Sequence, residues 1–238
     1  MSNISETIGD YLSINFRSFE RKLRLAIVRA ARDLSRSGLA FATYDNSRCN
    51  PVFWDRTEQG GFLLKKGVPP FDAIKDIYVH GSSYATECST AIPIIFYKAL
   101  VDLFPAGLFN ELFANLYLYD WKVDRDLGVH VEVPSQYLPG DCRYFDNPDF
   151  NPDTPQWQGE NVIDLGDGTY YGHGMGIAVP EKFIMVLNSL RKIGAGRSAY
   201  LTDEATRPDF KYLSDRYYGY TGLVYRVRMV NGASAFSH

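Results

Sequence analysis

Residues 84–104 form the strongest apolar run in the chain, and the length of this run is typical of a helix rather than a strand. Pro93 lies inside it. A proline inside a helix clashes with the carbonyl group four residues earlier, here that of Ser89. The run therefore predicts a helix that either begins near Ser89 or Thr90 or kinks at Pro93. Both alternatives place Cys88 at or near the amino-terminal end of the helix.

Composition excludes several classes of protein. The most apolar part of the run, residues 91–103, contains Lys98 and Asp102 and is shorter than the roughly 20 residues that span a bilayer, so we expect no membrane partner. Apolar residues make up 45% and charged residues 22% of the 238 residues, as in soluble globular domains, and we expect one domain over 1–238. A net charge of -3 provides no basic surface for phosphates, so we expect no nucleic acid partner.

The amino-terminal residues differ from a secretory signal. Residues 1–11 contain Glu6 and Asp10, where a signal would have a basic start and an apolar core. We therefore predict synthesis in the cytoplasm without Sec export.

The periodicity of apolar residues predicts most of the remaining elements. Steps of three or four residues predict an amphipathic helix over 15–37 that packs as an outer cover. Segment 122–158 is too rich in proline for regular elements, and no element is predicted after Pro208. Other patterns predict strands at 39–44, 52–55, 62–66, 116–121, 160–165 and 169–177 and helices at 71–78, 108–114 and 181–193.

Cys88 has the position of a nucleophile. The positive end of a helix dipole favours a thiolate, which lowers the pKa of a cysteine from about 8.5. The alternative is an inert buried cysteine, as most free cysteines are. Cys49 and Cys142 have no such position, and we expect both to be structural. Three cysteines without a CxxC pair indicate neither a disulfide framework nor a zinc site.

His173 is the candidate base among the four histidines. It is predicted to lie in the middle of a strand between Gly172 and Gly174, and such glycines indicate that a ligand or another backbone comes close. The other histidines lie in polar loops or, as His238, at the end of the sequence. The alternative for His173 is a core histidine bonded to a carbonyl group.

The hairpin about residues 166–168 predicts a partner for His173. A two-residue turn at Asp167 and Gly168 would set Val162 opposite His173, so Glu160 would be a diagonal neighbour on the same face. A three-residue turn would shift the register by one and place Glu160 and His173 on opposite faces. The alternative is an exposed carboxylate near an exposed histidine.

Two further patterns bear on ligands. The aromatic residues Trp121, Trp157, Tyr170 and Tyr171 are candidates to line a groove for an extended chain, with a core position as the alternative. The glycines of segment 172–176 have neither the spacing nor the βα context of a dinucleotide site, so we expect no nucleotide cofactor.

Several blocks of sequence, in order from about Leu23 to Arg207, resemble the spore-coat protein-glutamine gamma-glutamyltransferases of spore-forming bacteria. The blocks are Tyr84-Ala85-Thr86-Glu87-Cys88-Ser89-Thr90-Ala91-Ile92, Leu118-Tyr119-Asp120-Trp121, Gly140-Asp141-Cys142, Trp157-Gln158-Gly159-Glu160-Asn161-Val162-Ile163, Gly172-His173-Gly174-Met175-Gly176-Ile177, Leu187-Asn188-Ser189, Ser198-Ala199-Tyr200-Leu201 and Ala205-Thr206-Arg207. One short block would be weak evidence, but the ordered set is specific.

The resemblance implies a papain-like α+β domain, with the cysteine on a helix that packs against an antiparallel sheet. The family's nucleophile falls on Cys88, its main carboxylate on Glu160, an adjacent and partly redundant carboxylate on Glu87, and its strand histidine on His173. The resemblance further implies calcium independence, no cofactor, no metal and protein substrates that supply a glutamine and a lysine. We expect a monomer in the spore coat.

Three features depart from the family pattern. Pro93 replaces an aliphatic residue, the amino-terminal extension is short, and the segment 208–238 has no recognised counterpart. Because of these departures, the alternative to a spore-coat protein is a toxin that is delivered out of the cell. The alternatives for activity are a cysteine peptidase or glutamine deamidase with the same centre, and a structural coat protein without catalysis.

Overall fold

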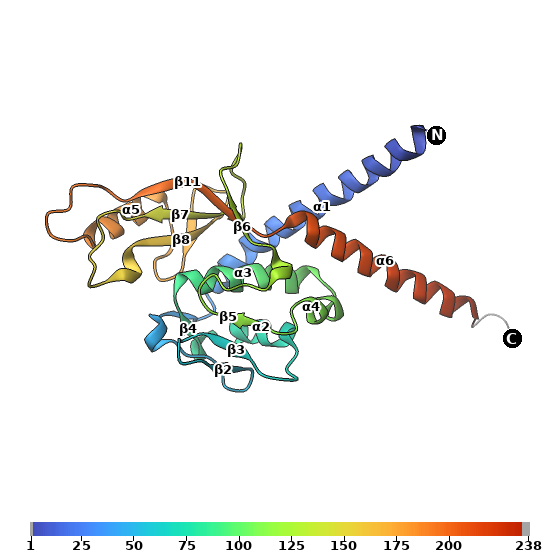
Figure 1. The fold of residues 1–238 in the computed structure, drawn as a ribbon, viewed down its shortest axis with the longest axis horizontal. Coiled ribbons are helices and arrows are strands. Elements are labelled where there is room, and N and C mark those ends of the chain that lie inside the picture. The colour runs from blue at the N-terminus through green and yellow to red at the C-terminus, as the bar shows by residue number, and fades with distance from the viewer. Residues whose placement is uncertain (1, 235–238) are drawn as a thin grey trace.

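The computed structural model describes residues 2–234, and side chains for 13–222. A six-stranded antiparallel sheet forms one layer, in the order β10-β9-β8-β7-β11-β6 (Figure 1). The helices α1 (Ser2–Leu34) and α3 (Cys88–Leu103) pack on one face, and α5 (Pro180–Ser189) packs on the other. The strands are β6 (His130–Glu132), β7 (Cys142–Asp146), β8 (Gly159–Asp164), β9 (Tyr170–Gly172), β10 (Gly176–Ala178) and β11 (Tyr200–Arg207).

Most of the remaining elements lie on the other side of α3 from this sheet (Figure 1). They include a three-stranded antiparallel sheet and a two-stranded parallel pair, β1 with β4. Only Glu87 separates β4 from α3, so the pairing with β1 positions the chain that enters the helix at Cys88. The bounds are β1 Ala40–Phe41, β2 Trp54–Arg56, β3 Phe62–Leu64, α2 Pro70–Val79, β4 Ala85–Thr86, α4 Ala106–Leu112 and β5 Tyr117–Leu118. Short 3-10 helices lie at Tyr44–Asn46, Gly81–Ser83, Arg125–Leu127 and Pro155–Trp157.

The strand β8 is buried on both faces. Alternation along the strand directs Ile163 into the main core with α1 and α3, and Val162 into a smaller core with Phe183 of α5. A strand clamped in this way is a rigid support for its neighbouring residues Glu160 and Asn161. The α+β prediction is confirmed.

The helix α3 begins at Cys88. This confirms the prediction that Cys88 lies at or near the amino-terminal end of the helix. It contains Pro93 as its sixth residue, so the regular helix starts one residue before Ser89. Glu87 precedes it in an extended conformation, with φ -81° and ψ 165°.

Four parts of the fold differ from the sequence prediction. The segment 122–158 is not wholly irregular, because the short β6 forms before its first proline, Pro134, and β7 forms between Pro139 and Pro148. The strand β11 was not predicted. The segment after Pro208 forms α6 (Phe210–Ser234), which starts beside the middle of α1 and extends from the body in a direction that diverges from the early part of α1 (Figure 1). The helix α1 itself begins well before residue 15.

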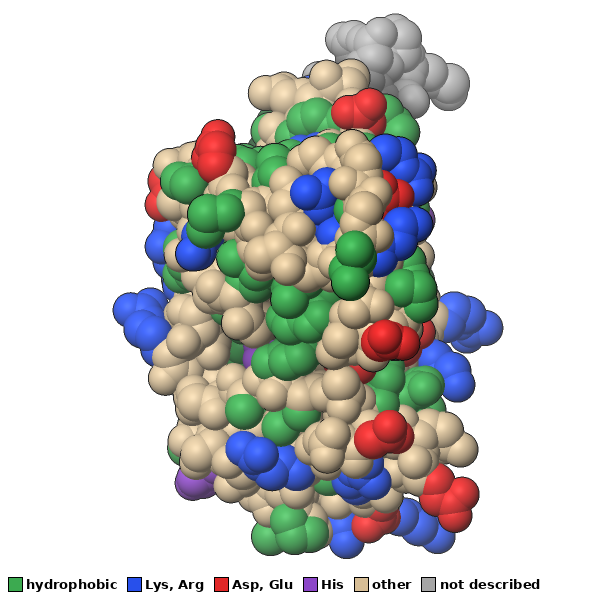
Figure 2. Space-filling view, turned by 90° about the vertical axis from the view of Figure 1, so that its left-hand side faces the viewer, with side chains coloured by type: hydrophobic (Ala, Val, Ile, Leu, Met, Phe, Trp, Pro, Cys, Tyr) green, Lys and Arg blue, Asp and Glu red, His purple; other side chains and the backbone are tan. Residues whose placement is uncertain are grey.

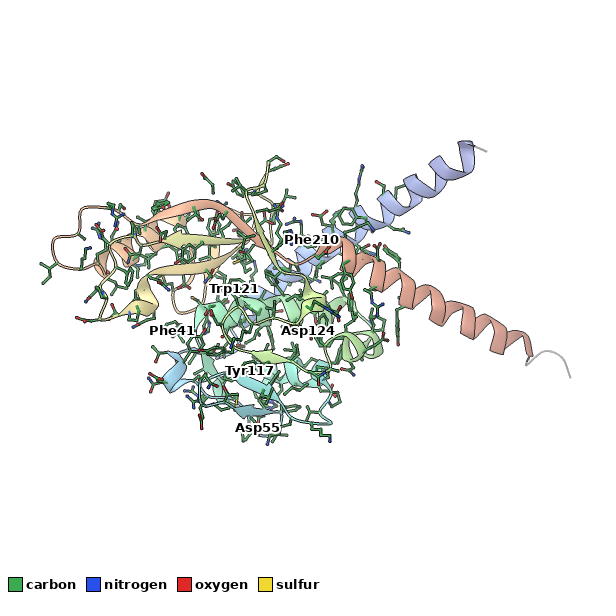
Figure 3. All side chains as sticks on the ribbon, in the orientation of Figure 1. Phe41, Asp55, Tyr117, Trp121, Asp124 and Phe210 are labelled. Atoms are coloured by element: carbon green, nitrogen blue, oxygen red, sulfur yellow. The ribbon has the colours of Figure 1, made fainter. Side chains whose placement is uncertain are left out.

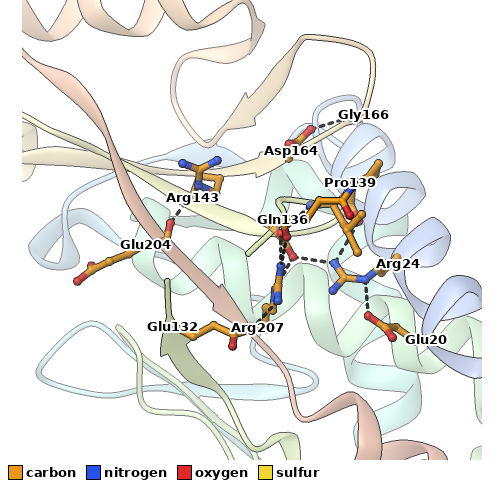
Figure 4. A network of polar contacts seen from close by, with 12 residues as sticks. Glu20, Arg24, Glu132, Gln136, Pro139, Arg143, Asp164, Gly166, Glu204 and Arg207 are labelled. Carbon is orange, nitrogen blue, oxygen red and sulfur yellow. Dashed lines mark hydrogen bonds and ion pairs between the residues drawn. The ribbon is translucent and has the colours of Figure 1, made fainter. Parts of the chain in front are cut away.

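Asp141 joins α1 to β11 through Arg24 and Arg207, two residues that Figure 4 labels. Its oxygen Oδ1 accepts hydrogen bonds from Arg24 Nη1 and Arg207 Nε, both at 2.7 Å. Its oxygen Oδ2 accepts from Arg207 Nη2 at 2.7 Å and from Leu138 N at 2.9 Å. Burial alone would raise the pKa of Asp141, but the hydrogen bonds from Arg207 and Arg24 hold this pKa below its usual value.

We predict that Asp141→Asn lowers the free energy of unfolding at pH 7 by about 3–5 kcal/mol, because two nearly buried arginines lose their anion. The folded pKa of Asp141 is depressed, so its stabilising effect is present at neutral pH and is lost as the pH falls through that pKa. Urea denaturation measures both effects. Asp33→Asn is the matched control, because Asp33 pairs with Arg36 in solvent and its loss changes stability by less than about 1 kcal/mol. Equal losses of unfolding free energy in the two variants would contradict the stabilising role of Asp141.

Among residues 2–234, no helix combines the length and apolar character needed to cross a bilayer.

Candidate active site

Cys88 lies at the first position of α3 and is 8% exposed. Burial raises the pKa of its thiol, and the neighbouring Glu160 carboxyl raises it further. The backbone N–H and the side chain of Asn161 act in the opposite direction, and Asn161 Nδ2 donates to the sulfur at 3.8 Å. The sequence prediction of a lowered pKa is therefore wrong for this closed site, since burial outweighs the effect of the helix end.

Glu160 lies within the same enclosed space. Its side chain is fully buried, and neither carboxyl oxygen has a well-aligned hydrogen-bond partner among the described residues. Burial raises the pKa of Glu160 well above its usual value, while the thiol of Cys88 lowers it. The structure thus brings together Cys88 and Glu160, which are 72 residues apart in the sequence. A buried carboxyl without a partner is costly to a fold and is typical of a functional site.

Gly172 has no side chain, and this makes room for the Glu160 carboxyl. It pairs with Val162, and a Cβ atom at position 172 would lie 2.8 Å from Glu160 Oε1 and 2.6 Å from Cε1 of Phe183. Both distances are too short for ordinary contact, so a larger residue must displace the carboxyl or the ring.

We predict that Gly172→Ala lowers the rate of the reaction at Cys88 by about 10- to 100-fold, because a shift of about 1 Å in a reacting group has effects of this size. Overpacking should also lower stability by about 1–3 kcal/mol. Steady-state kinetics with a melting curve separate the two effects. Gly196→Ala is the control, since a Cβ atom there has no neighbour within 4 Å. An active Gly172→Ala enzyme with unchanged kinetics would contradict the placement of Glu160.

The predicted pairing of Glu160 with His173 is wrong. Leu165 N donates to the oxygen of Thr169, so the loop contains three residues and Val162 faces Gly172 instead of His173. This is the alternative register described above. The predicted strand 169–177 is also interrupted, because the chain folds back after Gly172 and β10 returns beside β9. His173 therefore begins a turn.

His173 is a buried, neutral histidine whose two nitrogens are both occupied. Its Nε2 lies 3.1 Å from the Ala40 carbonyl and must donate to it, while Nδ1 lies 3.0 Å from the hydroxyl of Tyr171 and accepts from it. Burial lowers the pKa of His173 to about 4, although contacts with the backbone of Ala40 and Thr86 oppose this. The imidazole thus ties the turn after β9 to β1, which pairs with the strand leading to Cys88.

Glu87 lies directly before the nucleophile candidate. Its Oε1 accepts a hydrogen bond from Tyr44 N at 3.3 Å. Burial raises the pKa of Glu87, the Tyr44 N–H lowers it, and the carboxylates of Asp120 and Asp45 raise it. Glu87 is half-buried and lies at the surface of a cleft.

The cleft has a volume of about 1070 Å³ and opens onto Cys88. Its walls come from the Tyr44–Asn46 segment, the start of α3, the loop after β5, and the strands β7 and β8. Neither Glu160 nor His173 reaches this surface, so the thiol is the point of contact between the cleft and the buried carboxyl. Figure 2 shows the side of the molecule at which α3 begins, where hydrophobic side chains gather along the middle and charged ones lie mainly toward the edges.

The four aromatic groove candidates have different positions, and Tyr170 packs edge-on against Phe145 and does not line the cleft. Trp121 lines the cleft, and Figure 3 shows it near the amino-terminal end of α3. Trp157 stacks on Phe41 at 5.4 Å between ring centroids and does not line the cleft. Tyr171 is 2% exposed and belongs to the core, so its assignment to a groove is wrong.

The loop that carries Trp121 is anchored to α3. Asp120 has φ 52°, the one positive value among the described residues other than glycine, and its N–H donates to Thr90 Oγ1 at 2.9 Å. Backbone strain of this kind is common next to active sites.

Two site residues were missed in the sequence. Asn161 contacts the sulfur of Cys88, and only its position next to Glu160 could have drawn attention to it. The hydroxyl of Tyr44 lies 2.7 Å from Ser89 Oγ, and its ring packs on Tyr119. No local pattern distinguishes Tyr44 from the other 16 tyrosines of the chain. Within the described part of the chain, no group of three or more His, Cys, Asp and Glu side chains could hold a metal ion, and His238 lies outside it.

Comparison with known proteins gives consistent results. A family model described as protein-glutamine gamma-glutamyltransferase matches residues 2–217. A protein of that name from Bacillus mycoides is 49% identical over 197 residues, which cover 83% of this chain and 71% of the relative. The protein of the same name from Bacillus cereus is 48% identical with the same coverage.

A solved structure is also similar. It is described as the transglutaminase from Geobacillus stearothermophilus without its C-terminal extension, and it superimposes with a TM-score of 0.82 at 51% identity. The match covers 85% of this chain and 97% of that one.

Proposed function

The chain belongs to the protein-glutamine gamma-glutamyltransferase family and is a transglutaminase, and we propose that it forms glutamine–lysine isopeptide bonds between proteins through a thioester on Cys88. The observation that carries this mechanism is the buried Glu160 carboxyl, which has no well-aligned hydrogen-bond partner among the described residues and faces the Cys88 thiol at the wall of the cleft.

The first half-reaction acylates the enzyme. The ionised Glu160 accepts the thiol proton as the sulfur of Cys88 attacks the carbon of a glutamine carboxamide. The carbonyl double bond opens to an oxyanion. When this collapses, the carbon–nitrogen bond breaks, and the nitrogen takes the proton from Glu160 and leaves as ammonia. A nucleophilic cysteine divides a difficult exchange of amides into two easier steps.

The second half-reaction transfers the acyl group to an amine. A lysine ammonium ion, with a pKa near 10.4, must first lose one proton to the water in the open cleft, because only the neutral amine can attack the thioester. Glu160 accepts a proton from the attacking nitrogen. As the carbon–sulfur bond breaks, this proton returns to the sulfur and the isopeptide product leaves. One carboxyl group can serve both steps, because burial raises its pKa toward that of the groups it exchanges protons with.

Glu87 and His173, the other two candidate catalytic residues, have supporting roles next to Cys88 and Glu160. Glu87 lies at the cleft surface, where an arriving lysine can reach it, and we propose that it is a secondary proton acceptor. His173 has no free nitrogen and does not line the cleft, so we assign it to positioning the strand that leads to Cys88.

One experiment separates the candidate activities. A fluorescent primary amine and casein are incubated with the enzyme, and amine incorporation and ammonia release are both measured. The proposed transferase gives both. Ammonia without incorporation would identify a glutamine deamidase, and the absence of both would favour a structural protein without catalysis.

Further proposals rest on the resemblance of sequence. We propose that the chain acts as one domain and as a monomer, that activity needs no calcium, and that the cross-linked proteins belong to a spore coat. Amine incorporation that survives a chelator such as EDTA would support calcium independence. Immunolocalisation in the source organism separates a spore-coat location from that of a delivered effector.

A further inference from the structure

We propose that Asn161 is a catalytic residue whose side-chain amide donates a hydrogen bond to the oxyanion formed when Cys88 attacks a carboxamide or when an amine attacks the thioester. This assignment rests on the proposed function of the same site. It goes beyond the cysteine and carboxylate pair by naming the group that stabilises the negative charge of both intermediates.

The position of the amide fits this role. Asn161 Nδ2 lies 3.8 Å from Cys88 Sγ, and Asn161 is at the cleft surface while its neighbour Glu160 is buried. In the intermediate, the oxyanion is bonded to the carbon that is attached to this sulfur. A donor at the observed distance from the sulfur can lie about 2.7–3.1 Å from that oxygen, which is the range required of an oxyanion donor.

The backbone supplies further donors beside the amide. At the start of α3, the N–H groups of Thr90 and Ala91 both donate to the carbonyl of Glu87. Those of Cys88 and Ser89 have no acceptor among the described residues. Such groups point out of the amino-terminal end of a helix and favour a negative charge there. Asn161 therefore completes a set of neutral donors around the sulfur.

The charges of the cleft make such donors necessary. Among the described residues that line it, there is no lysine or arginine. The carboxylates in its wall, Asp45, Glu87, Asp120 and Glu204, would oppose a developing negative charge. Stabilisation must therefore come from oriented N–H groups, and Asn161 presents the side-chain amide in contact with the nucleophile.

The support behind Asn161 is rigid. Residues 159–164 form β8, which pairs with β7 on one side and β9 on the other. Asn161 pairs with Tyr144, and the next residue, Val162, is fully buried. A donor fixed on a central strand needs little rearrangement as the charge develops, which is the condition for a large catalytic effect.

The test compares two reactions of the same sulfur in Asn161→Ala. Acyl transfer forms an oxyanion, whereas alkylation of Cys88 by iodoacetamide is a direct displacement at a saturated carbon and forms none. We expect kcat for amine incorporation to fall by about 10²- to 10³-fold, the usual effect of removing one oxyanion donor. The rate of Cys88 alkylation, followed by mass spectrometry, should fall by less than about tenfold, because only one hydrogen bond to sulfur is lost.

Asn161→Asp is the second variant, since it keeps the shape of the side chain and removes both amide N–H groups. It should lose at least as much acyl transfer. Asn115→Ala is the matched control, because Asn115 is exposed, outside the cleft and without a side-chain hydrogen bond, and it should retain wild-type rates. Melting curves identify any variant that fails to fold.

Two results would overturn the assignment. Equal losses in acyl transfer and alkylation would show that Asn161 acts on the thiol alone, and unchanged acyl transfer in both variants would show that it has no role. Failure of the proposed function is a separate outcome, because it appears as absent amine incorporation in the unmodified enzyme. If the enzyme proves to be a deamidase, the same comparison is made with ammonia release.

Discussion

Cys88→Ala is expected to abolish amine incorporation, with a loss of at least about 10⁴-fold, because no other group can form the thioester. The other two cysteines cannot take its place. Cys142 is buried in β7, and burial raises the pKa of Cys49 to about 11 at a position away from the cleft. Incorporation of a fluorescent amine into casein measures the loss.

Cys49→Ala is the matched control for this variant and should retain activity, since Cys49 has no contact with the site. The melting temperature of Cys88→Ala should remain close to that of the unmodified enzyme. Residual transfer above about 1% of the original rate in a folded Cys88→Ala protein would exclude Cys88 as the essential nucleophile.

Glu160→Gln is expected to lower kcat by about 10²- to 10⁴-fold, the range for losing a general acid–base group. The substitution preserves shape, so the loss reports the missing proton acceptor. If Glu87 accepts protons in its place, some activity remains, and Glu87→Gln in the same protein should remove it. Glu87→Gln alone should have a smaller effect, because the carboxyl of Glu87 is bonded to Tyr44 N.

The same variant tests the pH dependence. Burial raises the pKa of Glu160 well above 4.5, and only its ionised form can accept the thiol proton. Activity of the unmodified enzyme should therefore rise with increasing pH through that raised pKa. In Glu160→Gln this limb of the kcat/KM profile should disappear. A profile that keeps the limb would assign it to another group.

The helix that carries Cys88 could be predicted from sequence. The length of the apolar run indicates a helix, and Pro93 favours a beginning close to Cys88, since proline is tolerated best in the first turn, although the structure has it as the sixth residue. The approximate positions of β8 and α5 also follow from local patterns. Resemblance to a family, rather than local pattern, assigned Glu160 to the same site as Cys88.

The contacts around His173 could not be predicted, because they depend on one residue of loop length. A two-residue turn and a three-residue loop are both compatible with two glycines around Asp167, and the observed loop has Gly166 and Gly168 at φ 78° and 83°. That single difference moves His173 away from Glu160. Alternation of apolar and polar side chains normally fixes the register of a strand. It cannot do so after Tyr171, because Gly172 and Gly174 have no side chains.

The strand β7, which precedes β8, could not be predicted for a different reason. Prolines on both sides suppress the signal of β7, although the strand itself contains none. Its stability comes from pairing with β8, the next strand, and with β11, which lies much further along the sequence. Asn161 was overlooked for a related reason, since its contact with Cys88 exists only after the sheet and α3 have packed.

The most direct test is to trap the acyl-enzyme. The enzyme is incubated with a glutamine-containing peptide without an amine, quenched in acid and analysed by intact-protein and peptide mass spectrometry. The account predicts an adduct of the peptide mass less one ammonia, located on Cys88 and released when a primary amine is added. An adduct on another residue, or active turnover during which no adduct can be trapped on Cys88, would contradict it.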